Sequence, residues 1–150
     1  MTWTKTWEGV VEEDWLDELG HVNFLTYQRI ADFASVDIWR RAQANERSAS
    51  NVQFVVVEMH VRYLRELLLM SRVEIYSSLI AWDTKRFHLL HRIESAGAIA
   101  CTVETMNLCF DVILRKIIPL APATSSYFAS WCEPPKDAVP RLSITGRRHD

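Results

Sequence analysis

The sequence predicts an α+β fold in which a mostly antiparallel sheet wraps around one long central helix. Two observations predict this class: a long helical segment after one early strand, and then a run of alternating segments that follow one another directly. Strands that are consecutive in the chain pair as antiparallel neighbours, and their apolar face packs on the helix. The early strand is expected over residues 2–11, where Thr, Trp and Val roughly alternate, and an acidic loop follows over residues 12–22.

The central helix is expected from Phe24 to about Asn45, because this segment contains no Gly or Pro and its apolar residues recur at helical spacing. Asn23, directly before it, is suited to cap the first turn. The apolar residues cover most of the helix circumference, which is typical of a helix buried on several sides. A polar connector over residues 46–51 leads to the next element.

Later elements follow the same pattern. Four strands are expected over residues 52–65, 72–82, 85–94 and 98–114, and a short helix is expected over residues 123–132. One domain is therefore expected over residues 1–132. The tail over residues 133–150 is rich in Pro and ends in basic residues, so we expect it to be poorly ordered or to lie on a neighbouring chain.

Alternation along a strand also predicts which side chains share a face of the sheet. In the strand over residues 52–65 it places Phe54 on the same face as Glu58 and opposite Met59. We expect the outer face of the sheet, with Phe54, Leu89 and Phe110, to be covered by a second subunit.

Composition excludes several classes of protein. The chain has 150 residues, a hydrophobic fraction of 49% and a formal net charge of −2, with no dense basic stripe, so no nucleic-acid partner is expected. No apolar run reaches the ~18 residues of a membrane span, and the first residues lack the apolar core of a signal peptide, so no membrane partner is expected. The three cysteines form no CxxC pair, which favours reduced thiols and a cytoplasmic location.

No catalytic metal or bound cofactor is expected either. His88 and His91 lie three residues apart on one expected strand, so they point to opposite faces and do not share a metal. The sequence contains no nucleophile elbow, no Walker loop and no dinucleotide-binding fingerprint.

The segment before the central helix carries the chemistry. Asp17, Gly20, His21 and Asn23 lie within seven residues. A carboxylate that faces the start of a helix suits hydrolysis of an ester or thioester, because the acid can activate water or attack directly while free N–H groups of the first turn hold the oxyanion. Each residue also has a plainer interpretation: a solvated loop acid, a glycine with positive φ, an exposed or packed histidine and a helix cap.

A second candidate lies in the turn Asp83-Thr84-Lys85-Arg86. Its two cations, Lys85 and Arg86, belong either to a solvated hairpin or to a docking point for a phosphate.

The segment over residues 17–27 resembles the D-x-x-G-H-V-N-x-x-x-Y signature of the 4-hydroxybenzoyl-CoA thioesterase-like hotdog family. Residues 15–23 are also similar to the W-x-D-x-x-G-H-x-N form of a subgroup that includes thioesterases of carnitine breakdown, which act on betainyl-CoA. Further similarity to that subgroup lies in residues 60–66, 83–91 and 104–108, and the resemblance covers roughly residues 5–120.

The resemblance implies a role for each matching residue. Asp17 matches the catalytic carboxylate, and the backbone N–H groups around Val22 to Phe24 match the oxyanion-binding helix start. His21 and Asn23 match residues that line the acyl pocket and complete the expected catalytic set. The remaining residues expected to contact substrate are Trp15, Gly20, Val22, Phe24, Tyr27, Lys85 and Arg86.

The sequence departs from the commonest family pattern at Trp15, where many members carry an acid, and at Phe24, where many carry Asn. Trp15 beside acidic neighbours either packs as an ordinary aromatic residue or attracts a cationic acyl group. The family also implies a homodimer or a dimer of dimers, with each active site built from two chains.

The function expected from these residues is hydrolysis of a small acyl-CoA thioester, with coenzyme A present only as part of the substrate. The acyl group is betainyl or another short polar group. A non-catalytic hotdog module that binds acyl-CoA, or that only oligomerises, is the main alternative. A hotdog hydratase would need a differently spaced Asp/His pair, which the sequence does not contain.

Overall fold

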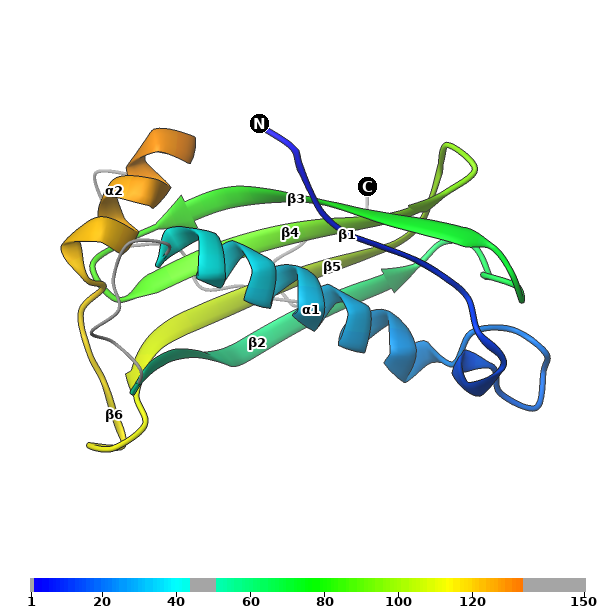
Figure 1. The fold of residues 1–150 in the computed structure, drawn as a ribbon, viewed down its shortest axis with the longest axis horizontal. Helices are drawn as coiled ribbons and strands as arrows, with labels where there is room; N and C mark the ends of the chain where they lie inside the picture. The colour runs from blue at the N-terminus through cyan, green and yellow to red at the C-terminus, as the bar shows by residue number, and fades with distance from the viewer. Residues whose placement is uncertain (1, 44–50, 134–150) are drawn as a thin grey trace.

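The structure is a computed structural model that describes residues 2–43 and 51–133. One long helix, α1 (Phe24–Ala42), lies across one face of a single antiparallel sheet (Figure 1). The order of strands in the sheet is β1-β3-β4-β5-β2, and β6 pairs with β5. This is the predicted α+β hotdog architecture.

The predicted elements are present with bounds shifted by a few residues. The strands are β1 (Thr4–Val10), β2 (Val52–Tyr63), β3 (Arg72–Trp82), β4 (Arg86–Ser95), β5 (Ala98–Asp111) and the short β6 (Lys116–Ile117), which was not expected. A 3-10 turn, η1 (Glu13–Trp15), lies in the acidic loop, and α2 (Pro122–Trp131) follows the sheet. The predicted tail lies outside the described residues except for its first residue, Glu133.

The helix α1 buries one face and not several sides as expected, since Phe24, Leu25 and Phe33 are 56%, 56% and 42% exposed. Its buried residues are Tyr27, Ile30, Ala31, Ala34, Ser35, Ile38, Trp39 and Ala42. The Asn23 side chain accepts a hydrogen bond from the Leu25 N–H at 2.9 Å, which confirms the predicted cap. Two basic residues in the last turn suit the negative end of the helix dipole.

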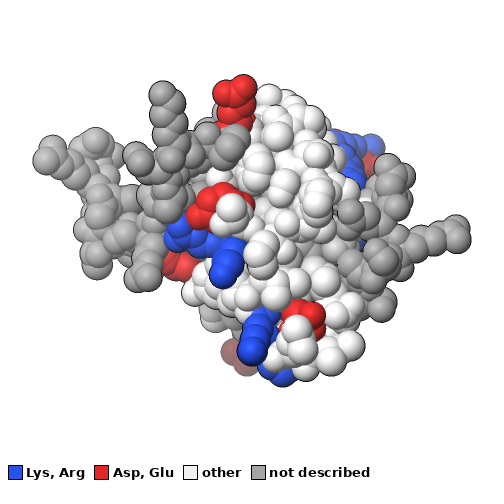
Figure 2. Space-filling model, turned by 90° about the vertical axis from the view of Figure 1, so that its left-hand side faces the viewer, with Lys and Arg blue, Asp and Glu red and all other residues white. Residues whose placement is uncertain are grey.

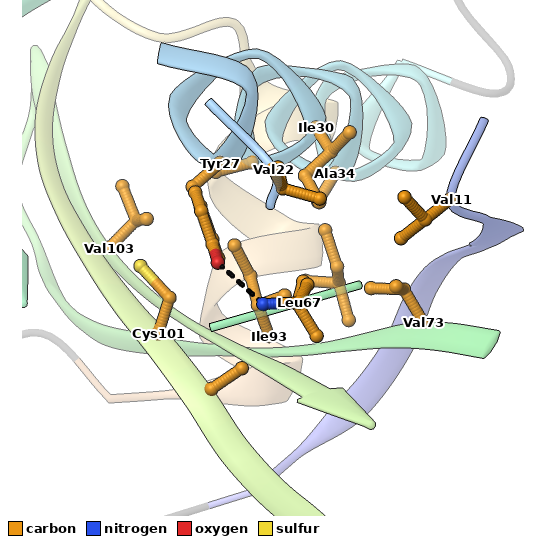
Figure 3. Packing of buried hydrophobic residues seen from close by; sticks show 13 residues of the cluster. Val11, Val22, Tyr27, Ile30, Ala34, Leu67, Val73, Ile93, Cys101 and Val103 are labelled. Carbon is orange, nitrogen blue, oxygen red and sulfur yellow. Dashed lines mark hydrogen bonds between the residues drawn. The ribbon is translucent and has the colours of Figure 1, made fainter. Parts of the chain in front are cut away.

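The core divides along α1 into two clusters. Near the start of the helix, Tyr27, Ile30 and Ala34 pack on the β3–β5 face of the sheet with aliphatic residues such as Val73 and Ile93 (Figure 3). Near the end of the helix, aromatic rings predominate: Trp39, Phe54, Phe87 and Phe128 lie within 5.0–5.8 Å of a neighbouring ring. Helix α2 closes this second cluster, since Phe128 is fully buried against Phe87.

Two predicted assignments to the outer face of the sheet, those of Phe54 and Leu89, are wrong. The register between β2 and β5 shifts between Val56 and Glu58, so a bulge interrupts the alternation. Phe54 therefore faces α1 and packs on Trp39, while Glu58 points away from the helix side. Leu89 is likewise buried in the aromatic cluster, so neither Phe54 nor Leu89 needs a second subunit to cover it.

A buried polar chain crosses the interface between helix and sheet at the middle of α1. The Ser35 hydroxyl lies 2.9 Å from His91 Nε2, the Ser77 hydroxyl lies 2.6 Å from His91 Nδ1, and the Thr6 hydroxyl lies 2.7 Å from Ser77 Oγ. Burial lowers the pKa of His91 from its ordinary 6.5 to about 3. His88 points to the other face, where Glu104 contacts it, so the opposite orientation of the two histidines is confirmed.

Candidate active site

The segment before α1 folds into a tight hairpin that presents Asp17 and His21. The Asp17 N–H donates to the His21 carbonyl at 3.0 Å, and the Asn23 N–H donates to the Trp15 carbonyl at 2.8 Å. Gly20 occupies the turn with φ 75°, and a Cβ built there would meet nothing within 4 Å. Its role is therefore the left-handed backbone conformation, and no crowding explains it.

The start of α1 offers fewer free amides than the resemblance implies. The Val22 N–H donates to the Leu67 carbonyl, and the Asn23 N–H is used in the hairpin. The Asn23 side chain accepts a hydrogen bond from the Leu25 N–H. Only the Phe24 N–H, of the three from Val22 to Phe24, has no hydrogen-bond partner among the described residues.

His21 lies between two carboxylates. Its Nε2 is 3.4 Å from Asp17 Oδ2, and its Nδ1 is 3.1 Å from Glu66 Oε2. The other Asp17 oxygen, Oδ1, accepts the Leu19 N–H at 2.9 Å. The side chain of Asp17 is 24% exposed and that of Glu66 is 61% exposed, so the chain of contacts runs from a sheltered acid to a solvated one.

These groups border a cavity of about 400 Å³ at the start of α1. Its wall combines the hairpin, the first turn of α1 and the segment that leaves β2: Asp17, Leu19, His21, Val22, Phe24, Tyr27, Tyr63, Leu64, Arg65 and Glu66. Five of the predicted site residues, Asp17, His21, Val22, Phe24 and Tyr27, are therefore brought together in one cavity. The cavity is largely apolar apart from the acids, His21, Arg65 and the two tyrosine hydroxyls.

Two tyrosines fix the far wall of this cavity. The Leu67 N–H donates to the Tyr27 hydroxyl at 3.1 Å, as Figure 3 shows, and the Tyr63 hydroxyl donates to the Phe24 carbonyl at 3.0 Å. The two rings meet edge to face at 5.3 Å. The segment that carries Glu66 is thus tied to the start of α1.

The other five predicted site residues do not line this cavity: Gly20 and Asn23 form the turn of the hairpin and the cap of α1, and Trp15, Lys85 and Arg86 lie elsewhere. Trp15 packs at 6.0 Å from Trp7 and lines a second, smaller cavity of about 180 Å³ with Arg29. Lys85 and Arg86 lie in the β3–β4 turn, close to α2 and at the opposite end of the sheet from η1 (Figure 1).

The cations of the β3–β4 turn are not equally available. Arg86 is paired with Asp83, with an Nη2–Oδ2 distance of 2.7 Å, whereas Lys85 is exposed. Figure 2 shows the end of the molecule that carries α2, where positive and negative residues are scattered over a largely uncharged surface. Within one subunit these cations are separate from the cavity that holds Asp17.

The cysteines are unsuitable as alternative nucleophiles. Burial raises the pKa of Cys101 to about 12 and that of Cys109 to about 11, so both thiols are protonated near neutral pH. All three cysteines are free. Over residues 2–43 and 51–133, no group of three or more His, Cys, Asp and Glu side chains is placed to hold a metal ion.

Five residues that line the cavity were not predicted as site residues from the sequence: Leu19, Tyr63, Leu64, Arg65 and Glu66. Tyr63 and Glu66 lie in the segment over residues 60–66 that shares the subgroup pattern, but nothing in their spacing relates them to Asp17, which is more than forty residues earlier. The pairing of Val22 with Leu67 creates that proximity.

Comparisons with known proteins bear on the family and the fold of the chain. The model of the thioesterase-like superfamily matches residues 11–128. A betainyl-CoA thioesterase of Pseudomonas aeruginosa is 27% identical over 95 residues, which cover 62% of this chain and 60% of that protein. An L-carnitine dehydrogenase/betainyl-CoA thioesterase of Agrobacterium fabrum is 29% identical over 119 residues, which cover 77% of this chain and 24% of that protein. The chain thus spans less than two thirds of the length of either curated relative, 60% of the first and 24% of the second.

A solved structure extends the agreement to the whole fold. A Staphylococcus aureus protein in complex with CoA superposes with a TM-score of 0.76 at 21% identity, covering 100% of this chain and 97% of that one. Among the described residues, no helix is long and apolar enough to cross a membrane. The match of the superfamily model over most of the chain confirms the family predicted from the sequence: the chain belongs to the thioesterase-like superfamily.

Proposed function

We propose that this protein hydrolyses acyl-CoA thioesters and that Asp17 is the reacting acid. The observation that carries the proposal is that Asp17 and Phe24, whose N–H is unpaired, line one cavity at the start of α1. A carboxylate can activate water or attack the thioester carbon, and a free amide at the positive end of a helix can stabilise the oxyanion that forms. The family match and the names of the curated relatives support the same reaction.

In the proposed reaction the thioester carbonyl enters the cavity with its oxygen toward the Phe24 N–H. Asp17 removes a proton from a water molecule that attacks the carbonyl carbon, or attacks that carbon itself to form a mixed anhydride. The amide stabilises the oxyanion, and the C–S bond then breaks to release coenzyme A. A single turnover in ¹⁸O water separates the two routes, because only direct attack transfers a carboxylate oxygen of Asp17 to the first product.

For the acyl group we propose a small cationic group such as betainyl. Three aromatic rings, Phe24, Tyr27 and Tyr63, line the cavity together with the carboxylates of Asp17 and Glu66. Aromatic faces and carboxylates attract a quaternary ammonium group. Trp15, which the sequence indicated for this purpose, lines the neighbouring cavity instead, so these three rings take over the role proposed for it.

We also propose a homodimer or a dimer of dimers. β2 lies at the edge of the described sheet and pairs with β5 alone, and Val56 and Val57 on it are 41% and 55% exposed. An open edge of this length invites pairing with a second chain. The coenzyme A arm would then run along the subunit boundary, and its phosphates would lie near Lys85 or Arg86 of one of the subunits.

The proposal is tested with a panel of acyl-CoA esters in a thiol-release assay. The panel contains betainyl-CoA, several short aliphatic esters and several aromatic esters. We expect release from at least one ester, with the highest kcat/KM for the betainyl ester. Binding of acyl-CoA without release by any ester would instead support the non-catalytic module, and preference for an uncharged ester would contradict the cationic acyl group alone.

A further inference from the structure

We propose that Glu66 is a positioning residue that fixes the ring of His21 and its tautomer, so that the unprotonated Nε2 faces Asp17. The catalytic consequence of this inference rests on the proposed function, but the tautomer itself does not. Glu66 has no role in the sequence expectations, and it reaches the site from the segment between β2 and β3.

The contacts of the imidazole ring determine the tautomer. Glu66 Oε2 is 3.1 Å from His21 Nδ1, within hydrogen-bond distance, whereas Asp17 Oδ2 is 3.4 Å from Nε2. A neutral imidazole has one N–H, and an ionised carboxylate only accepts hydrogen bonds. The shorter contact therefore favours the proton on Nδ1, which leaves the Nε2 lone pair facing Asp17.

The backbone holds Glu66 in this place. The Val22 N–H, next to His21, donates to the carbonyl of Leu67, next to Glu66, at 2.9 Å. The Leu67 N–H is bonded to Tyr27 of α1. Because the residue after His21 is bonded to the residue after Glu66, buried main-chain contacts hold the two backbones together and bring the exposed Glu66 side chain within reach of the ring.

The charged and titratable groups around His21 come from four parts of the chain. Asp17 belongs to its own hairpin, Glu66 and Arg65 belong to the segment after β2, and the hydroxyls of Tyr27 and Tyr63 belong to α1 and β2. Both hydroxyls are engaged with the backbone of Leu67 and Phe24. The two carboxylates are therefore the groups that contact the ring nitrogens.

In hydrolysis by water, the Nε2 lone pair would share the proton that Asp17 removes. The water oxygen bonds to the thioester carbon as one of its O–H bonds breaks, and the proton passes to Asp17, whose new O–H then donates a hydrogen bond to the Nε2 lone pair. The C–S bond then breaks with its electron pair on sulfur, and the same proton returns to that thiolate. The products are the acyl acid and the coenzyme A thiol, so atoms and charge balance.

The test reads the tautomer directly. Long-range ¹H–¹⁵N correlation spectra at neutral pH distinguish a protonated Nδ1 from a protonated Nε2, and His21→Gln identifies the signals of His21. We expect the Nδ1–H tautomer in the wild type and in Glu66→Gln, whose carbonyl oxygen still accepts the hydrogen bond. We expect Glu66→Ala to shift His21 toward the Nε2–H tautomer.

Kinetics provide the second readout. We expect Glu66→Ala to lower kcat ~10- to 100-fold while KM changes only slightly, and Glu66→Gln to restore most of the loss. Glu13→Gln is the matched control, because Glu13 is an exposed acid in η1 outside the cavity. Circular dichroism and thermal unfolding are expected to be unchanged, since the Glu66 side chain is 61% exposed.

Three results would overturn the inference: an Nε2–H or doubly protonated ring in the wild type, an unchanged tautomer in Glu66→Ala, or a kcat for Glu66→Ala equal to that of the Glu13→Gln control. Failure of the proposed function looks different. If the wild type releases no thiol from any ester, the reaction is wrong, and the spectra still decide whether Glu66 orients His21.

Discussion

The two ends of α1 are built in opposite ways. At its C-terminal end, Trp39, Phe87 and Phe128 are buried, the Trp39 and Phe87 rings stack at an interplanar angle of 10°, and α2 closes the cluster. At its N-terminal end, the helix opens onto a cavity of about 400 Å³ with acids in its wall. Aromatic rings fill the C-terminal end. At the N-terminal end a cavity stays open, and hydrogen bonds hold the surrounding loops in place.

This difference indicates how the chain separates stability from chemistry. The hairpin and the cavity wall hold polar groups in place through backbone hydrogen bonds, such as those from Asn23 to Trp15 and from Val22 to Leu67. At the aromatic end closely packed rings fill the space, and the Trp39 indole N–H is buried there without a hydrogen-bond partner among the described residues. Substitutions at the two ends should therefore separate into those that change turnover and those that change the free energy of unfolding.

The largest effect is expected for Asp17→Asn. The amide still accepts the Leu19 N–H through Oδ1 but cannot take a proton or attack, so kcat should fall by a factor of about 10²–10⁴. Thiol release measures kcat, and chemical denaturation should give an unchanged free energy of unfolding. Near-normal turnover would remove Asp17 from the mechanism.

Phe87→Ala tests the other end of the helix. Phe87 is fully buried and contacts the rings of Trp39, Phe54 and Phe128, so its loss should lower the free energy of unfolding by about 3–5 kcal/mol. Urea titration measures the change, and kcat of the protein that remains folded should stay near that of the wild type. A comparable loss of kcat in that folded fraction would show that the two ends are coupled.

The free energy of unfolding should depend on pH through His91, which packs against the middle of α1. Because the folded pKa of His91 is about 3 and the ordinary value is 6.5, the unfolded chain takes up a proton below about pH 6.5 that the folded chain does not. Folding stability should therefore fall as the pH drops toward 3, by about 2 kcal/mol between pH 8 and pH 5 from this group alone. Urea titrations across this range should show that His91→Gln loses that part of the dependence. Parallel curves for the two proteins would contradict it.

The smallest effect is expected for Asn23→Ala. Without the side-chain acceptor for the Leu25 N–H, the free energy of unfolding should fall by ~1 kcal/mol. Asn23→Asp keeps an oxygen at the cap and should retain most of the stability, which thermal unfolding can measure. Equal stability of the Ala variant and the wild type would show that the cap contributes nothing here.

Sequence reasoning recovered the fold because its signals are local. The apolar spacing of α1, the cap at Asn23 and the turn at Gly20 each depend on a few neighbouring residues. The bulge in β2 does not, since it appears only when β2 is aligned with β5. A single extra residue reversed the predicted face of Phe54, and with it one argument for a second subunit.

The candidate site was predictable in part for the same reason. Asp17 and His21 lie in one short motif, whereas Glu66 reaches His21 through the pairing of two segments far apart in the chain. Trp15 shows the converse error, because closeness in sequence to Asp17 did not place its ring in the same cavity. A sequence does not give the distance between segments that are far apart in the chain. The distance between Lys85 and Asp17 could therefore not be predicted either.

The residues of the cavity wall come from two segments of the chain, and this arrangement has an evolutionary consequence. The reacting acid comes from the hairpin before α1, while Tyr63 comes from the end of β2 and Glu66 from the segment after it. Main-chain contacts, the two tyrosines and the His21–Glu66 contact join these segments. Replacing side chains at the end of β2 would reshape the space offered to the acyl group without moving the carboxylate. Selectivity for the acyl group could thus change through substitutions in one short stretch of sequence while the reacting carboxylate stays the same.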